Sequence, residues 1–124
     1  MLFRSAPYAT TANTTTGGPD VTLTPTVTQA VAMALHELVT NAVKYGALSN
    51  PSGHVAVNWH QRVDEEASRV KIEWRESGGP PVVRPTKTGY GTSLIREMIP
   101  HELGGTVDLA FVPDGVCCRI EVPL

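Results

Sequence analysis

Three polar residues with complementary chemistry lie four and three positions apart in one stretch of the sequence: Glu37, Asn41 and Lys44. On an α-helix, these residues lie within about 60° of one another around the axis. A carboxylate that can accept a proton, a carboxamide oxygen that can bind a metal ion and an ammonium that can bind phosphate then share one face. The spacing therefore predicts a row of groups suited to phosphate and metal chemistry, although each residue singly is typical of an ordinary helix surface.

Apolar residues on the other side of this stretch predict a helix packed on a core. They recur at the period of an amphipathic helix: Val31, Leu35, Leu38, Ala42 and Tyr45. Thr24 followed by Pro25 predicts the N-terminal cap and the first helical residue. Thr26 with Gln29 is a competing capping box. The helix is expected to run to about Tyr45, with Gly46 as a glycine C-terminal cap.

A second acidic residue, Glu76, follows an alternating strand in the register of Trp74. That register points its side chain to the core side of the sheet. Because an acidic group is rarely buried without a partner, the carboxylate there needs a hydrogen-bond donor. The donor could be an amino group of a ligand, a backbone N–H or a threonine side chain. The competing interpretation is a carboxylate that points to solvent at a frayed strand end.

Glycines precede the expected second helix. Gly89, Gly91 and Thr92 would supply flexible backbone and free N–H groups at the positive end of that helix, where phosphate oxygens bind well. Arg84 and Lys87 lie in the loop leading to it and could meet phosphates. Each of these features, taken singly, is more typical of an ordinary turn or a solvated loop.

The elements that must position these residues follow from the hydrophobic pattern. Alternating strands are expected at 21–23, at 55–59 with 70–74, and at 107–111 with 116–122. The short connections within the last two pairs make antiparallel pairing the simplest arrangement. The order strand, helix, two strands, loop, helix, two strands predicts an α+β two-layer sandwich, with helices on one face of a largely antiparallel sheet.

The second helix is expected to open within residues 89–92. Its apolar stripe comprises Leu94, Ile95, Met98 and Ile99. Pro100 should end or kink this helix, because proline has no backbone N–H to donate. Residues 101–103 could add a last turn before Gly104.

The composition is that of one ordinary globular domain. The chain has 124 residues, 41% hydrophobic and 18% charged, with a net charge of −2 and no Lys/Arg cluster, which argues against nucleic acid as a partner. No apolar run approaches the roughly 20 residues of a membrane helix, and no signal peptide is expected. Residues 1–17 lack periodicity and are expected to be a flexible linker before a domain at 18–124.

The two cysteines, Cys117 and Cys118, are neighbours in the sequence. On a strand they would point to opposite faces and could not easily bridge. Free thiols favour a reducing, cytoplasmic setting, whether the parent protein is soluble or anchored to a membrane.

Residues 36–46, His-Glu-Leu-x-x-Asn-Ala-x-Lys-Tyr-Gly with x at unmatched positions, resemble the N box of the GHKL ATP-binding superfamily. Within it, the chain is most similar to the HWE group of bacterial sensor histidine kinases, named for a histidine in the N box and a Trp-x-Glu in the G1 region. Here these would be His36 and residues 74–76. Residues 76–81 resemble that group's G1 segment, and 89–92 its G2 box.

The resemblance implies a Bergerat-type ATP-binding fold with ATP and Mg²⁺ as cofactors. Glu37 would orient or deprotonate the attacking group, and Asn41 would coordinate the Mg²⁺ that bridges the phosphates. Lys44 and Tyr45 would contact phosphate or ribose. Glu76 would accept a hydrogen bond from the adenine amino group.

The remaining positions matched by the family boxes are expected to border the nucleotide. Gly78, Gly89 and Gly91 would let the backbone approach it and let a lid move. His36 and Thr92 are the other expected nucleotide-binding residues.

The resemblance also implies a function. Kinases of this group carry an upstream dimerisation and phosphoacceptor segment with a reactive histidine, and no histidine precedes His36. The chain is therefore expected to be the catalytic and ATP-binding domain alone, or a fragment of a longer protein. It is expected to transfer the γ-phosphoryl of Mg-ATP to a histidine on a separate domain. A response regulator would be an indirect partner, and this domain is expected to contact neither nucleic acid nor a membrane.

Two classes of alternative stay open. One is another enzyme of the superfamily, either an ATPase in which Glu37 activates water or an anti-sigma-type serine kinase. The Trp-x-Glu variant and the absence of a downstream transducer domain argue against the ATPase. The other is a non-catalytic nucleotide-binding or interaction module.

Overall fold

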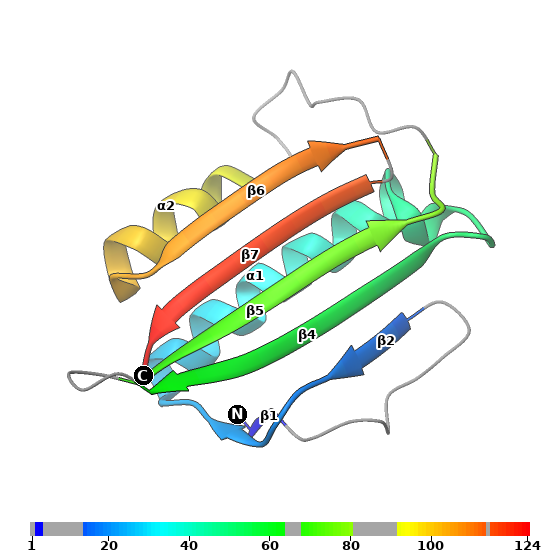
Figure 1. The fold of residues 1–124 in the computed structure, drawn as a ribbon. Coiled ribbons are helices and arrows are strands. Elements are labelled where there is room, and N and C mark those ends of the chain that lie inside the picture. The colour runs from blue at the N-terminus through cyan, green and yellow to red at the C-terminus, as the bar shows by residue number, and fades with distance from the viewer. Residues whose placement is uncertain (1, 4–13, 64–67, 81–91, 114) are drawn as a thin grey trace.

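The computed structural model describes residues 2–3, 14–63, 68–80, 92–113 and 115–124. Within these residues, two α-helices cover one face of a five-stranded sheet (Figure 1). The strands lie in the order β2-β4-β5-β7-β6 across the sheet. This arrangement confirms the α+β two-layer sandwich that the hydrophobic pattern predicts.

The helices and strands have the following bounds. In chain order they are β1 (Leu2–Phe3), β2 (Thr14–Gly17), β3 (Val21–Thr22), α1 (Pro25–Lys44), the 3-10 helix η1 (Ala47–Ser49), β4 (His54–Val63), β5 (Ser68–Ser77), α2 (Thr92–Leu103), β6 (Thr106–Val112) and β7 (Gly115–Pro123). The pairs β4–β5, β5–β7 and β6–β7 are antiparallel, and β2 joins β4 in parallel. The predicted strand at 21–23 is β3, which pairs with β1 outside the main sheet.

Helix α1 begins where its cap predicts. The hydroxyl of Thr24 accepts a hydrogen bond from the backbone N–H of Val27 at 3.4 Å, and Pro25 is the first helical residue. The competing capping box is therefore wrong. Of the predicted core stripe, three residues are buried and a fourth is partly buried: Val31, Leu38, Ala42 and Leu35.

The end of α1 corrects two predictions. Tyr45 is 56% exposed, because it follows the last helical residue and its backbone (φ −130°, ψ −16°) no longer keeps the helical period. Tyr45 is itself the cap, and its N–H and that of Gly46 donate to the carbonyl of Asn41 at 2.8 and 3.1 Å. Gly46 has a φ of −115°, so the expected left-handed glycine cap is absent at this described residue.

The predicted linker is wrong for Thr14–Gly17. These residues form β2, the edge strand beside β4, and Thr15 Oγ1 lies 3.1 Å from Nε2 of His54. Trp59 Nε1 donates to the carbonyl of Pro19 at 2.7 Å. A short polar run has no apolar alternation, so only its pairing with β4 reveals it as a strand. Residues 4–13 lie outside the described residues.

Helix α2 begins at Thr92, the last of the residues expected to open it, and does not end at Pro100. Ile95 and Ile99 are fully buried, and the helix continues through the exposed Pro100 to Leu103. The additional last turn is therefore confirmed. Gly104, at φ +66°, ends the helix, and its N–H donates to the carbonyl of Pro100 at 3.2 Å. This is the left-handed glycine cap that the first helix lacks.

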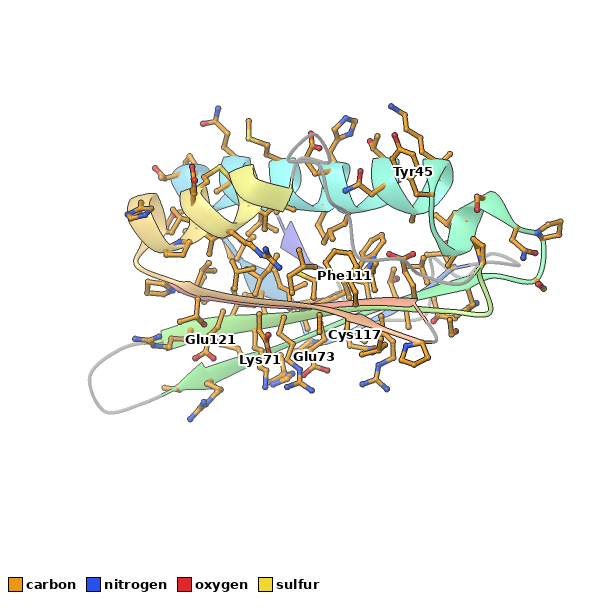
Figure 2. The ribbon with its side chains drawn as sticks, turned by 90° about the horizontal axis from the view of Figure 1, so that it is seen from above. Tyr45, Lys71, Glu73, Phe111, Cys117 and Glu121 are labelled. Carbon is orange, nitrogen blue, oxygen red and sulfur yellow. The ribbon has the colours of Figure 1, made fainter. Side chains whose placement is uncertain are left out.

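The two faces of the sheet differ in chemistry. Cys118 points inward and is 1% exposed, whereas Cys117 is half-buried, and both are free thiols, as predicted. Lys71, Glu73 and Cys117 point away from the helices (Figure 2). Oε1 of Glu73 forms ion pairs with Nζ of Lys71 at 3.6 Å and with Nε of Arg119 at 3.9 Å. The core therefore lies between the sheet and the helices, and the opposite face is polar. No helix in the described ranges has the length and apolarity needed to cross a membrane.

Candidate functional site

A buried carboxylate lies near the end of strand β5. Glu76 is 2% exposed and, among the described residues, is the one charged side chain in the buried set. Its Oε1 accepts a hydrogen bond from the backbone N–H of Ala47 at 2.9 Å, and its Oε2 accepts one from Nε1 of Trp74 at 3.0 Å. The predicted inward direction is confirmed, and the solvent-facing alternative is wrong.

One of these two donors was expected and the other was missed. A backbone N–H was among the predicted partners, and Ala47 supplies it. The indole of Trp74 is not among the predicted partners, although its position in the sequence indicates it. Residues two apart on a strand share a face, so Trp74 and Glu76 had to point to the same side.

Glycines let three backbone segments close around Glu76. A Cβ on Gly46 would collide with Glu76 Oε1, and one on Gly115 would lie 2.8 Å from the carbonyl oxygen of Glu76. A Cβ on Gly79 would lie 2.7 Å from Cα of Ala47. The turn after α1 therefore meets the carboxylate itself, whereas the start of β7 packs against the backbone of Glu76 and the segment after β5 packs against the turn.

Gly78 has a separate local requirement. Its φ is +68°, in the left-handed region that favours glycine, and a Cβ there would lie 2.6 Å from the carbonyl oxygen of Ser52. The hydroxyl of Ser52 donates to the carbonyl of Gly78 at 3.2 Å. The predicted glycine is thus required by the backbone, whether or not a ligand approaches it.

The predicted polar row lies on α1, upstream of the turn that reaches Glu76. Glu37 and Asn41 are half-buried, and Lys44 is exposed at the last helical position. The two residues beside the row, His36 and Tyr45, are exposed, and Figure 2 shows Tyr45 in the helix layer. Two and three residues after the row ends at Lys44, Gly46 packs against Glu76 and the N–H of Ala47 donates to it.

The predicted phosphate loop is only partly described. Thr92 is the first residue of α2, which fits a loop that opens a helix. Gly89, Gly91, Arg84 and Lys87 lie outside the described residues. Within the described ranges, no group of three or more His, Cys, Asp and Glu residues is placed to hold a metal ion by itself.

Histidine kinases from Brucella match most of the chain. No protein-family model matches it. A blue-light-activated histidine kinase of Brucella anthropi is 38% identical over 109 residues, which is 88% of this chain and 22% of that protein. Its counterpart in Brucella ovis is 36% identical over 107 residues, again 22% of that protein's length. The chain therefore spans about a fifth of the length of the curated relatives it matches.

Solved structures share its fold. The histidine kinase domain of the blue-light activated histidine kinase EL346 of Erythrobacter litoralis superposes with a TM-score of 0.68 at 16% identity, covering 90% of this chain and 51% of that one. The nucleotide-free catalytic domain of histidine kinase ThkA gives 0.56 at 24%, covering 77% and 66%. ThkA in complex with the response regulator protein TrrA gives 0.57 at 24%, covering 87% and 33%. The chain is therefore homologous to about a fifth of the length of named blue-light-activated histidine kinases, and it has the fold of histidine kinase catalytic domains.

Proposed function

We propose that the chain binds Mg-ATP and transfers its γ-phosphoryl group to a histidine on a separate dimerisation and phosphoacceptor domain. The observation that carries this proposal is the buried carboxylate of Glu76. An ionised carboxylate has about four lone-pair sites, of which Trp74 and Ala47 use one on each oxygen. Glu76 therefore keeps acceptor capacity for the amino group of adenine. The bonded Trp74–Glu76 pair also supports assigning the chain to the HWE group.

The row on α1 supplies what phosphoryl transfer needs, which is mainly positioning and charge neutralisation. The carboxamide oxygen of Asn41 would hold Mg²⁺, because this ion takes one or two protein oxygens together with phosphates and waters. Bound Mg²⁺ would neutralise charge on the phosphates. Lys44 would contact a phosphate as a point charge. Glu37 would orient or deprotonate the attacking group.

Around this row, the other candidate residues would line the nucleotide. His36 and Tyr45 are exposed beside the row and accessible to ribose or phosphate. Gly78, together with residues 89–92 before and at the start of α2, would provide backbone that approaches the nucleotide. We further propose a cytoplasmic location, where ATP is available, and a response regulator as the downstream partner. The ThkA–TrrA complex supports the latter class of partner.

The proposal is tested with the full chain, Mg²⁺ and γ-labelled ATP, with and without a histidine-containing dimerisation domain. We expect label on the histidine of that domain. Glu37→Gln should abolish transfer while Mg-ATP still raises the melting temperature. Glu97→Gln, at an exposed position on α2, is the matched control and should transfer normally.

Other outcomes separate the alternatives. Phosphate release with no transfer would identify an ATPase, and label on serine would identify a serine kinase. Binding without turnover would identify a nucleotide-binding module. If Mg-ATP does not raise the melting temperature of the wild-type chain, the proposed site itself is wrong.

A further inference from the structure

We infer that Trp74 is a positioning residue that makes the proposed nucleotide site selective for adenine. It acts through Glu76, so the inference rests on the proposed function. The indole N–H would hold the carboxylate so that its free lone pairs face the 6-amino group of the base. Trp74 itself is 3% exposed and forms part of the core.

The carboxylate is held at two points from two different elements. Trp74 lies on β5, on the same face as Glu76, and binds Oε2. Ala47 lies 29 residues away in η1 and binds Oε1. The terminal torsion of a glutamate is broad and weakly restricted by itself. One donor would leave the other oxygen free to swing, whereas two donors from separate elements fix the plane of the carboxylate.

Both holding groups are donors only. A backbone N–H and an indole N–H cannot accept a hydrogen bond, so each oxygen facing them acts as an acceptor. Adenine has an amino donor at its 6-position, and guanine has a carbonyl oxygen there. Guanine would therefore place its carbonyl oxygen against carboxylate oxygens that already act as hydrogen-bond acceptors. A site built to accept from a ligand amino group rejects a ligand that lacks it, because buried polar groups are then left unpaired.

The second tryptophan of the chain provides a matched control. Trp59 is 7% exposed, lies on the neighbouring strand β4, and its Nε1 donates to the carbonyl of Pro19 at 2.7 Å. It therefore has the same residue type, similar burial and one indole hydrogen bond. Its hydrogen-bond partner is Pro19, in the segment between β2 and β3, and not Glu76. Loss of its N–H should affect stability without affecting the choice of base.

The experiment compares Trp74→Phe and Trp59→Phe in the full chain, with the Mg²⁺ complexes of ATP, GTP and purine riboside triphosphate, which lacks the 6-amino group. Dissociation constants are measured by titration calorimetry. We expect Trp74→Phe to weaken ATP about tenfold, the value of roughly one hydrogen bond, and to leave the purine analogue unchanged. The preference for ATP over GTP should shrink by a similar factor. Trp59→Phe should keep all three constants and lower only the melting temperature.

A merely structural role for Trp74 would weaken ATP and the purine analogue equally, and that result overturns the inference while the proposed function stands. If the wild-type chain binds none of the three nucleotides, the proposed function itself fails. Should Trp74→Phe fail to fold, the wild-type chain still tests the inference through the ratio of the dissociation constants for ATP and the purine analogue. Equal constants would overturn the inference, because no held acceptor would then face the 6-amino group, and tighter binding of ATP would support it.

Discussion

Gly46 and Glu76 occupy adjoining space, so that a Cβ on Gly46 would collide with Glu76 Oε1. The φ of Gly46 is −115°, which any residue can adopt. Close approach of the helix end to the carboxylate, and not backbone conformation, therefore requires glycine here. Gly46, which follows α1 directly after Tyr45, therefore packs against the acidic residue of the distant strand β5.

Gly46→Ala should therefore damage both stability and the site. The added methyl group meets Glu76 Oε1 and lies 3.1 Å from Cα of Ala42, so we expect a loss of about 1–3 kcal/mol in unfolding free energy, as for other overpacked positions. Urea denaturation measures it. Gly104→Ala is the control, because it strains a φ of +66° but meets nothing within 4 Å. Only Gly46→Ala should also weaken Mg-ATP binding. Wild-type stability for Gly46→Ala would contradict the predicted collision.

The edge strand β2 predicts a stability difference between two truncated chains. One begins at residue 14 and keeps Thr14–Gly17; the other begins at residue 18 and lacks them. The second also loses the contact of Thr15 with His54. We expect it to be less stable by roughly 1–2 kcal/mol, the net worth of one or two hydrogen bonds. It should also associate more readily, because the edge of β4 is uncovered. Equal melting temperatures would show that the domain is fully stable from residue 18.

The buried thiol of Cys118 should make the folded chain less stable at alkaline pH. Burial, with a smaller contribution from the charge of Asp108, raises the pKa of its thiol from 9.0 to about 12. Below pH 9 the thiol is neutral in both states and its contribution to stability is intact. Between pH 9 and 12 it ionises first in the unfolded chain, so the free energy of unfolding falls.

Urea denaturation across this pH range measures the effect. Cys118→Ala should flatten the alkaline part of the profile, although it also loses packing in the core. Cys117→Ala, on the half-buried neighbouring thiol, should leave the profile close to wild type. An unchanged alkaline slope in Cys118→Ala would show that another group causes it.

Replacing Pro100 with alanine should increase the stability of the chain. It lies inside α2 and is exposed, and it cannot donate the backbone hydrogen bond of a helical residue. Proline costs about 3 kcal/mol relative to alanine in a helix interior. Its place near the end of α2 makes a smaller gain of about 1–2 kcal/mol the expectation for Pro100→Ala. Thermal denaturation tests this, with Glu97→Ala as a surface control. A lower melting temperature for Pro100→Ala would show that the proline supports the last turn.

The sequence by itself determined the elements whose periodicity is local. Helix α1 with its polar row, the hairpin of β4 and β5, and the hairpin of β6 and β7 all follow from spacing. These patterns can be read from the sequence because the geometry of one helix or strand alone sets the face on which each of its side chains lies. The inward direction of Glu76 and the separation of Cys117 from Cys118 follow from the same rule.

The tertiary structure alone decided which groups meet. Ala47 reaches Glu76 across 29 residues of sequence, and β2 is a strand because β4 lies beside it. The exposure of Tyr45 depends on where α1 stops, and the need for glycine at Gly46 depends on Glu76. These relationships are set by packing between elements, and packing leaves no periodic trace in the residues of either partner. The polar row on α1 therefore follows from spacing, whereas the carboxylate of Glu76 and its two donors meet only when the chain folds.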